Sequence, residues 1–290
     1  MGRRGRYELL LFGAALIWGS SFFMVKQAVD VVPTCLLLAI RFIVAAAILG
    51  LVFRNRLRAH LNRAIVWRGS VLGALIFGGY LLQTIGITMT TPGRNAFLTT
   101  AYCVMVPFLY WLVAKKRPDL YEVVAAFILI AGIGFISFDG GFSMNPGDLL
   151  SLLSGVLYAL QIIAIERFAR TCDVYVLTIL QFLVAGVIST ACGLLFEQIP
   201  ALDIWSPSLI AEVAYLAIAC TALALLMQNV GQAHVRPAAA SVILSLEGVF
   251  GVIFSMVFYG EQLTLRLFIG FALIFSAVII SQTKPSLKTR

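Results

Sequence analysis

The sequence predicts an all-α integral membrane protein of ten transmembrane helices, arranged as two inverted repeats of five helices. Hydrophobic residues make up 61% of the 290 residues and charged residues 12%, whereas a soluble protein carries about 25% charged residues. Apolar stretches close to the ~20 residues that a membrane-crossing helix needs recur along the chain with short breaks. A motif in the first half of the chain also returns in the second half.

The ten apolar stretches are separated by basic segments and prolines. The basic segments 54–68, 115–117 and 166–173 end three of the stretches, and Pro92 marks a short break between the third and the fourth. Helices are therefore expected at 7–29, 34–53, 67–88, 94–114, 120–138, 147–165, 174–196, 208–232, 237–258 and 265–282.

The repeated motif is Gln-x-x-Gly followed by proline. It spans Gln83–Pro92 and, 145 residues later, Gln228–Pro237. We therefore divide the chain into a first unit, residues 1–143, and a second unit, residues 144–290. A unit with an odd number of spans starts and ends on opposite sides of the membrane, so its copy must be inverted. Inverted repeats favour alternating access to a site between the halves, as in a transporter.

Basic residues indicate the topology. Most of the 21 Lys and Arg residues fall in the N-terminal tail, the C-terminal tail and the loops on one side, whereas Arg94 and Arg266 lie on the other. Cytoplasmic loops carry the excess of Lys and Arg, so both termini are expected in the cytoplasm. The net charge of +8 is thereby explained by topology, and we expect no nucleic-acid partner.

Motifs for catalysis, nucleotide hydrolysis and metal binding are missing from the sequence. The five cysteines have no metal-ligand spacing, and no GxxxxGK[ST], HExxH or GxSxG occurs. We expect no catalytic residues, no metal and no cofactor. An intramembrane enzyme is accordingly disfavoured.

Several segments resemble bacterial EamA-type members of the drug/metabolite transporter superfamily, and the resemblance covers essentially the whole chain. The segments that carry it are Trp18-Gly19-Ser20-Ser21-Phe22-Phe23, Lys26, Pro33, Arg41-Phe42, Pro107, Leu246-Glu247-Gly248-Val249-Phe250 and Tyr259-Gly260-Glu261.

The resemblance implies ten helices in two inverted units around a cavity lined by helices 1, 3, 4, 6, 8 and 9. It also implies export of amino acids or other small metabolites, while more distant relatives exchange nucleotide sugars or sugar phosphates. The family often has proline after the position of Glu247, and this chain has Gly248. A pre-formed kink in the ninth helix is therefore less expected in this chain than in family members with the proline.

Polar side chains at helical spacing fall in five of the six expected cavity helices. Because polar groups in a bilayer are costly, they should face the bundle interior or a hydrated cavity. The alternative is that small polar residues simply join neighbouring helices. The stripes are Tyr80, Gln83 and Thr84; Asn95, Thr99 and Tyr102; Ser151, Ser154, Tyr158 and Gln161; Thr221 and Gln228; and Ser241 and Ser245.

From these patterns we predict a substrate site. Aromatic rings next to the stripes could stack on a substrate and offer a polar group. The predicted substrate-binding residues are Trp18, Tyr80, Gln83, Thr84, Asn95, Thr99, Tyr102, Tyr158, Gln161, Gln228 and Ser245.

Two charges within the predicted spans, Glu247 and Arg41, stand apart from this set. Glu247 could titrate and couple transport to protons, pair with a substrate ammonium, or hold the ninth helix through Arg41, a backbone amide or a hydroxyl. Lys26 is near a helix end and is expected to reach the interface as an anchor.

The sequence thus favours a secondary transporter of a small polar metabolite, first of all an amino acid, in the inner membrane. The expected partners are a small-molecule substrate and the lipid bilayer. Alternatives are a nucleotide-sugar or sugar-phosphate exchanger and a lipid-handling membrane protein. Gly69-x-x-x-Gly73 permits close helix packing, which we expect to be used within a monomer.

Overall fold

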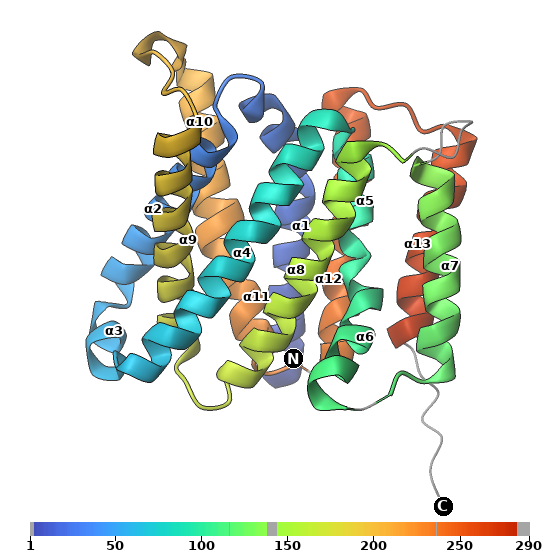
Figure 1. Ribbon diagram of the computed structural model, residues 1–290, viewed down its shortest axis with the longest axis horizontal. Helices are drawn as coiled ribbons and strands as arrows, with labels where there is room; N and C mark the ends of the chain where they lie inside the picture. The colour runs from blue at the N-terminus through green and yellow to red at the C-terminus, as the bar shows by residue number, and fades with distance from the viewer. Residues whose placement is uncertain (1–2, 116, 138–143, 236, 283–290) are drawn as a thin grey trace, which may run out of the picture.

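Long helices run side by side from one end of the molecule to the other (Figure 1). The computed structural model describes residues 3–115, 117–137, 144–235 and 237–282, and no strand occurs within these ranges. The elements are α1 (Arg3–Val29), α2 (Thr34–Val52), α3 (Arg54–His60), α4 (Arg63–Met89), α5 (Pro92–Thr100), α6 (Tyr102–Ala114), α7 (Leu120–Ser137), α8 (Pro146–Phe168), α9 (Val174–Phe196), η1 (Leu202–Ile204), α10 (Pro207–Tyr215), η2 (Leu216–Leu223), α11 (Ala224–Gln232), α12 (Pro237–Phe254), η3 (Ser255–Tyr259) and α13 (Leu265–Gln282).

Each of the ten predicted apolar stretches is helical over nearly its whole length. In the described part of the chain, seven helical runs are long and apolar enough to cross a membrane: Gly5–Val29, Thr34–Val52, Arg63–Met89, Pro92–Leu112, Pro146–Phe168, Val174–Phe196 and Pro207–Gln232. Three further apolar helices are shorter, namely Leu120–Ile136, Ile243–Tyr259 and Leu265–Ile280. The chain is therefore a multi-pass membrane protein.

Several helices begin at a side chain that caps their free backbone N–H groups, as short polar residues do at helix starts. Asn62 Oδ1 accepts from the amides of Ala64 and Ile65. The caps of α5, α8, α9 and α10 are Thr91, Asn145, Asp173 and Ser206.

The two halves of the chain interleave. Helices of the first half pack most extensively against helices of the second, in the pairs α7–α13, α4–α8, α1–α12, α2–α9 and α5–α12. Figure 1 shows α8 between α4 and the α5–α6 pair. Residue 143, at the expected boundary between the two units, is one of residues 138–143, which lie outside the described residues.

The glycines of the two Gln-x-x-Gly motifs allow the halves to approach closely. A Cβ on Gly86 would lie 2.9 Å from the carbonyl oxygen of Gly147 in α8. A Cβ on Gly231 would lie 2.6 Å from a methyl group of Leu11 in α1. In each half, the motif thus packs against the first helix of the other half.

The other glycines singled out in the sequence also serve packing within the chain. A Cβ on Gly69 or Gly73 would meet Leu180 or Val184 of α9 at 2.5 and 2.6 Å. Gly248 does not interrupt α12, and its Cα faces Thr100 of α5, whose methyl group would be 2.9 Å from an added Cβ. The absence of proline at this position is therefore matched by a continuous helix.

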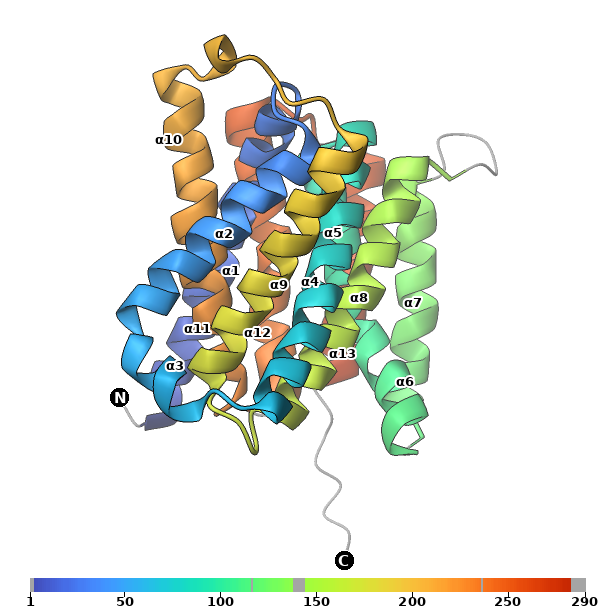
Figure 2. The ribbon, with the colours of Figure 1, turned by 60° about the vertical axis from the view of Figure 1, so that its left-hand side comes forward.

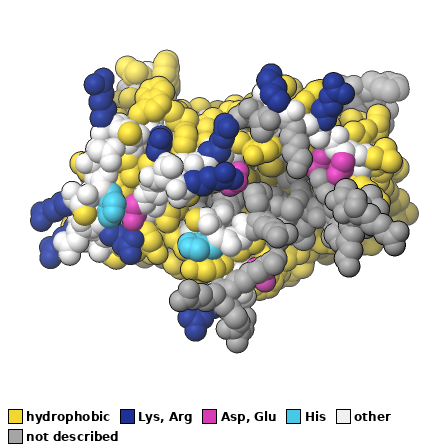
Figure 3. All heavy atoms as spheres, turned by 90° about the horizontal axis from the view of Figure 1, so that it is seen from below, with side chains coloured by type: hydrophobic (Ala, Val, Ile, Leu, Met, Phe, Trp, Pro, Cys, Tyr) yellow, Lys and Arg dark blue, Asp and Glu magenta, His cyan; other side chains and the backbone are white. Residues whose placement is uncertain are grey.

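One end of the bundle gathers the chain's basic loops. α1 begins and α13 ends at the lower end in Figures 1 and 2, where α3 also lies. Seen from below, this face carries Lys and Arg side chains around its edge (Figure 3). The expected basic residues Lys116, Arg236, Lys284, Lys288 and Arg290 lie outside the described residues.

Replacing Gly86 by alanine should destabilise the protein, because the new Cβ would press on backbone atoms of α8. Overpacking of this kind costs about 1–3 kcal/mol. Thermal unfolding of the purified protein in detergent measures the loss. Gly50→Ala is the matched control, since its Cβ would meet Ile179 at an ordinary 4.0 Å; equal melting temperatures for both variants would contradict the packing argument.

Candidate functional site

A polar and aromatic cavity lies inside the bundle, between helices of both halves. Among its lining residues are ten of the eleven predicted substrate-binding residues, together with both singled-out charges: Trp18, Arg41, Tyr80, Gln83, Thr84, Asn95, Thr99, Tyr102, Tyr158, Gln161, Gln228 and Glu247. Ser21, Phe22, Val25, Ile76, Ile87, Ile162 and Leu225 complete the lining. Through Arg41 the cavity also includes α2, a helix that the family resemblance did not place there.

The predicted residue Ser245 is buried but does not line this cavity. Its stripe partner Ser241 has a side chain outside the described residues. At the end of α1, Lys26 donates to the carbonyl of Thr88 at 3.0 Å, which agrees with the expected anchor.

Gln83 connects three helices through a fully used amide. Its Oε1 accepts from the hydroxyl of Tyr158 in α8 at 2.8 Å, and its Nε2 donates to Thr99 Oγ1 in α5 at 3.2 Å. Both ends of the amide are therefore occupied, and Gln83 fixes the position of the Tyr158 ring at the cavity wall.

Gln228, its counterpart in the repeat, is placed differently. The side chain is 5% exposed and faces the cavity, and it forms no hydrogen bond within the described residues. The two glutamines thus have the same sequence context but different roles: one amide holds the wall, and the other is available to a ligand.

Asn95 contributes mainly to the junction of α5 and α8. Its Nδ2 donates to Ser151 Oγ at 2.7 Å and to the Gln83 carbonyl at 3.2 Å. Ser151 in turn donates to the Gly147 carbonyl. The small-residue alternative therefore describes Ser151 well, since its hydroxyl joins helices and does not line the cavity.

The π-helical segment η2 holds two cavity side chains in place. Trp18 Nε1 donates to the carbonyl of Cys220 at 2.8 Å, and Arg41 Nε donates to Thr221 Oγ1 at 3.0 Å. A π-helical turn leaves backbone carbonyls that an α-helix would pair, and such turns are frequent at functional sites. Sequence periodicity gives no signal for this segment.

Arg41 brings a buried positive charge to the cavity. The residue is 2% exposed, and its guanidinium carbon lies 4.9 Å from the centre of the Tyr80 ring. Apart from the bond to Thr221, its side chain has no hydrogen-bond partner in the part of the chain that the structure describes. The two terminal nitrogens are thus free to bind an anion.

Glu247 brings the opposite charge from α12. It is 5% exposed and lines the cavity together with Tyr102. Within the described residues no ion pair joins it to Arg41. Of the structural partners expected for Glu247, Arg41 therefore forms no ion pair with it in this structure.

Aromatic rings pack against one another next to Arg41. The rings of Tyr80 and Tyr158 meet edge to face, with centroids 5.8 Å apart, and Phe42 packs against Tyr80 at 5.2 Å. This arrangement is favourable for aromatic pairs, and it leaves Tyr80 between Arg41 and Tyr158.

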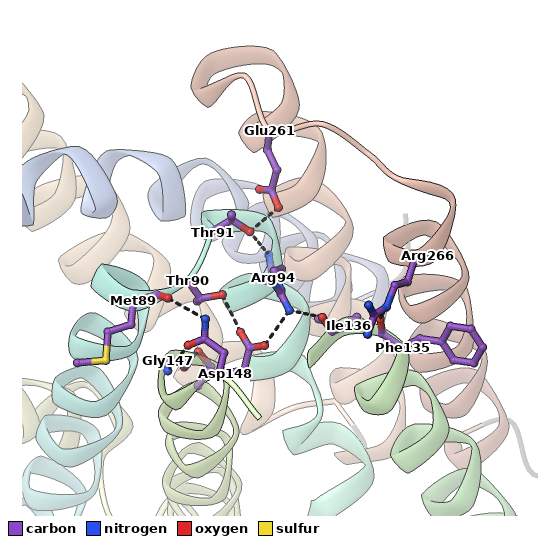
Figure 4. A network of polar contacts seen from close by, with 12 residues as sticks. Met89, Thr90, Thr91, Arg94, Phe135, Ile136, Gly147, Asp148, Glu261 and Arg266 are labelled. Atoms are coloured by element: carbon purple, nitrogen blue, oxygen red, sulfur yellow. Dashed lines mark hydrogen bonds and ion pairs between the residues drawn. The ribbon is translucent and has the colours of Figure 1, made fainter. Parts of the chain in front are cut away.

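A second polar network, at the opposite end from the basic loops, was not predicted (Figure 4). Arg94, expected at the start of the fourth span, lies in α5, 3.2 Å from the Asp148 carboxylate of α8. Asp148 also accepts from Thr90, and Glu261 accepts from Thr91. These contacts join segments far apart in the sequence, so spacing along one helix could not reveal them.

Comparison with known proteins gives consistent results. The EamA-like transporter family matches residues 5–138 and again residues 145–283. An "Uncharacterized transporter" of Archaeoglobus fulgidus is 32% identical over 94% of this chain and 84% of its own length. The "Uncharacterized inner membrane transporter YedA" of Escherichia coli K12 is 28% identical over 96% of this chain and 92% of its own.

One more distant relative has a named substrate, and one solved structure is similar. The "S-adenosylmethionine/S-adenosylhomocysteine transporter" of Chlamydia muridarum is 24% identical over 68% of this chain and 64% of its own length. A crystal structure with 20% sequence identity aligns over 96% of both chains with a TM-score of 0.70, which shows a shared fold.

Replacing Gln83 by leucine should destabilise the protein more than replacing Gln228 by leucine. The first change leaves the Tyr158 hydroxyl without its acceptor, at a cost of about 1–3 kcal/mol, whereas Thr99 keeps its bond to the Asn95 carbonyl. The second removes an amide that forms no hydrogen bond in this structure. Thermal unfolding of both variants tests the difference, and a larger loss for Gln228→Leu would overturn these assignments.

Proposed function

The chain belongs to the EamA-like transporter family, and on this premise we propose that it is a secondary transporter of small zwitterions, first of all α-amino acids. The observation that carries the proposal is that one cavity holds two opposite charges that form no ion pair with each other. Among the described residues that line it, Arg41 is the one cation and Glu247 the one acid. An α-amino acid offers a carboxylate to the first and an ammonium group to the second.

The cavity's neutral residues support the same substrate class. The free amide of Gln228 can bind polar side chains, while Trp18 and Tyr80 offer apolar ring surface. Ligand pockets typically combine such apolar walls with a few convergent polar groups. The Chlamydia relative is named for a substrate, S-adenosylmethionine, which itself contains an α-amino acid group.

We further propose that the protein lies in the inner membrane and crosses it with ten helices. Both termini would be in the cytoplasm. The ten helical apolar segments and the basic end of the bundle support this placement. Residues 1–143 and 144–290 would be the two inverted units. They would rock against each other near Pro92 and Pro237, so that the cavity opens alternately to each side, and the protein would act as a monomer.

Phosphorylated sugars fit the cavity less well. A phosphate group can carry two negative charges, whereas the described lining offers one cation, Arg41, and adds the acid Glu247. The tests below can also detect exchange of sugar phosphates or transport of lipids, which are the alternative functions.

Counterflow in proteoliposomes tests the proposal directly. Vesicles preloaded with a pool of unlabelled amino acids should accumulate labelled neutral amino acids, because exchange needs no energy source. Arg41→Gln should lower apparent affinity by about 10- to 100-fold, the worth of a hydrogen bond to a charged group. Lys26→Gln, which removes a charge at a helix end, should leave uptake unchanged; uptake of a sugar phosphate in place of amino acids would contradict the proposal.

Glu247→Gln should remove the preference for the ammonium group. The native protein should bind an amino acid at least about tenfold more tightly than its analogue without the amino group, because a charge-assisted hydrogen bond would be lost. The variant should bind the two ligands about equally. Competition against labelled substrate measures both constants, and an unchanged preference in the variant would assign Glu247 a purely structural role.

A further inference from the structure

Four amide side chains form a row that leads from the cavity to the basic end of the bundle. Gln161 of α8 lines the cavity, and Gln181 lies on the neighbouring α9. Asn229 and Gln232 follow on α11, close to the end of this helix. Gln232 also lines a surface pocket, together with Glu166, Ala169, Arg170, Ala233, His234 and Val235. We call Gln161, Gln181, Asn229 and Gln232 the amide row.

Contacts between helices hold the amide row together. Gln161 Nε2 donates to Gln181 Oε1 at 3.2 Å, and Asn229 Nδ2 donates to Thr178 Oγ1 at 2.9 Å. Thr178 and Gln181 are three residues apart on α9, so their side chains lie on the same face of that helix. The same holds for Asn229 and Gln232 on α11. The row therefore passes between α8, α9 and α11.

These amides are only partly satisfied, although they are buried. Gln181 and Asn229 are 0% exposed and Gln232 is 8% exposed. Gln181 Nε2, Asn229 Oδ1 and Gln232 Oε1 have no hydrogen-bond partner among the described residues. Buried polar groups without a partner are rare and each requires an explanation. Side chains that served helix packing alone would be paired or apolar.

The side of α9 opposite Thr178 and Gln181 is apolar and serves helix packing. Val176, two residues before Thr178 and therefore on the other side of the helix, is 0% exposed and packs in an apolar cluster with Ile65, Leu72 and Ile165. On α9, the unpaired polar atom, Gln181 Nε2, therefore lies on the side that meets α8 and α11 and not on the side packed in this cluster.

We propose that the amide row is the route by which the substrate passes between the cavity and the cytoplasmic side, closed in this structure. The idea rests on alternating access, as proposed above. When α11 moves away from α8 and α9, the unpaired amide groups become hydrogen-bond partners of a small zwitterion and its water shell. In the closed state they remain buried and hold the helices together through two hydrogen bonds.

Cysteine accessibility tests the route without knowledge of the substrate. In a transport-active chain whose five native cysteines are replaced, Asn229→Cys and Gln232→Cys should react with a membrane-impermeant trimethylammonium methanethiosulfonate in inside-out vesicles. Labelling should be about tenfold faster than for Val176→Cys, because thiol reactivity follows solvent access. Equal, slow labelling of all three positions would overturn the proposal.

Apolar replacement provides the second test. Gln232→Leu should leave the melting temperature unchanged or raise it, since this side chain forms no hydrogen bond within the described residues and its unpaired buried oxygen is removed. Transport should nevertheless fall about tenfold or more, as expected when a permeating solute loses a hydrogen-bond partner. Normal transport, or equal losses of transport and stability as for a structural pair, would contradict the proposal. If amino acids prove to be the wrong substrate, the labelling result is unaffected, so the two failures can be told apart.

Discussion

Hydrocarbon offers no hydrogen bonds to a polar side chain, and this constraint explains where the polar groups of the bundle lie. Each must pair across helices, reach an end of the bundle or face an internal space. Gln83, Asn95 and Glu261 pair across helices, and Lys26 bonds a carbonyl near a helix end. Gln228, Arg41 and Glu247 face the internal cavity. The cavity is thus defined by polar groups that the helices themselves do not satisfy.

The two halves of the chain share a scaffold but differ at the site. In both, the glycine of the Gln-x-x-Gly motif lets a helix approach the first helix of the other half. The glutamines then diverge: Gln83 is fixed by Tyr158 and Thr99, whereas Gln228 is free. One half supplies Arg41 and the other supplies Glu247. The cavity therefore carries a positive and a negative group from different halves, as a zwitterion carries two opposite charges.

Patterns along single helices were predictable from the sequence, and contacts between distant helices were not. Hydrophobic stretches located the helices, and helical spacing of Tyr80, Gln83 and Thr84 located one wall of the cavity. The bonds from Trp18 and Arg41 to η2 depend on a π-helical turn that leaves no periodic signal. The Arg94–Asp148 pair and the amide row join different helices, so neither could be predicted from spacing along one helix.

The central claim is that one internal cavity recognises both charges of a zwitterion. Trp18 lines that cavity and can report on it directly in a variant whose other three tryptophans, Trp67, Trp111 and Trp205, are replaced by phenylalanine. Titration with a neutral amino acid should change the Trp18 fluorescence saturably, whereas its N-acetyl and des-amino analogues should not. A response to the analogues equal to that of the amino acid, or to sugar phosphates alone, would contradict the claim.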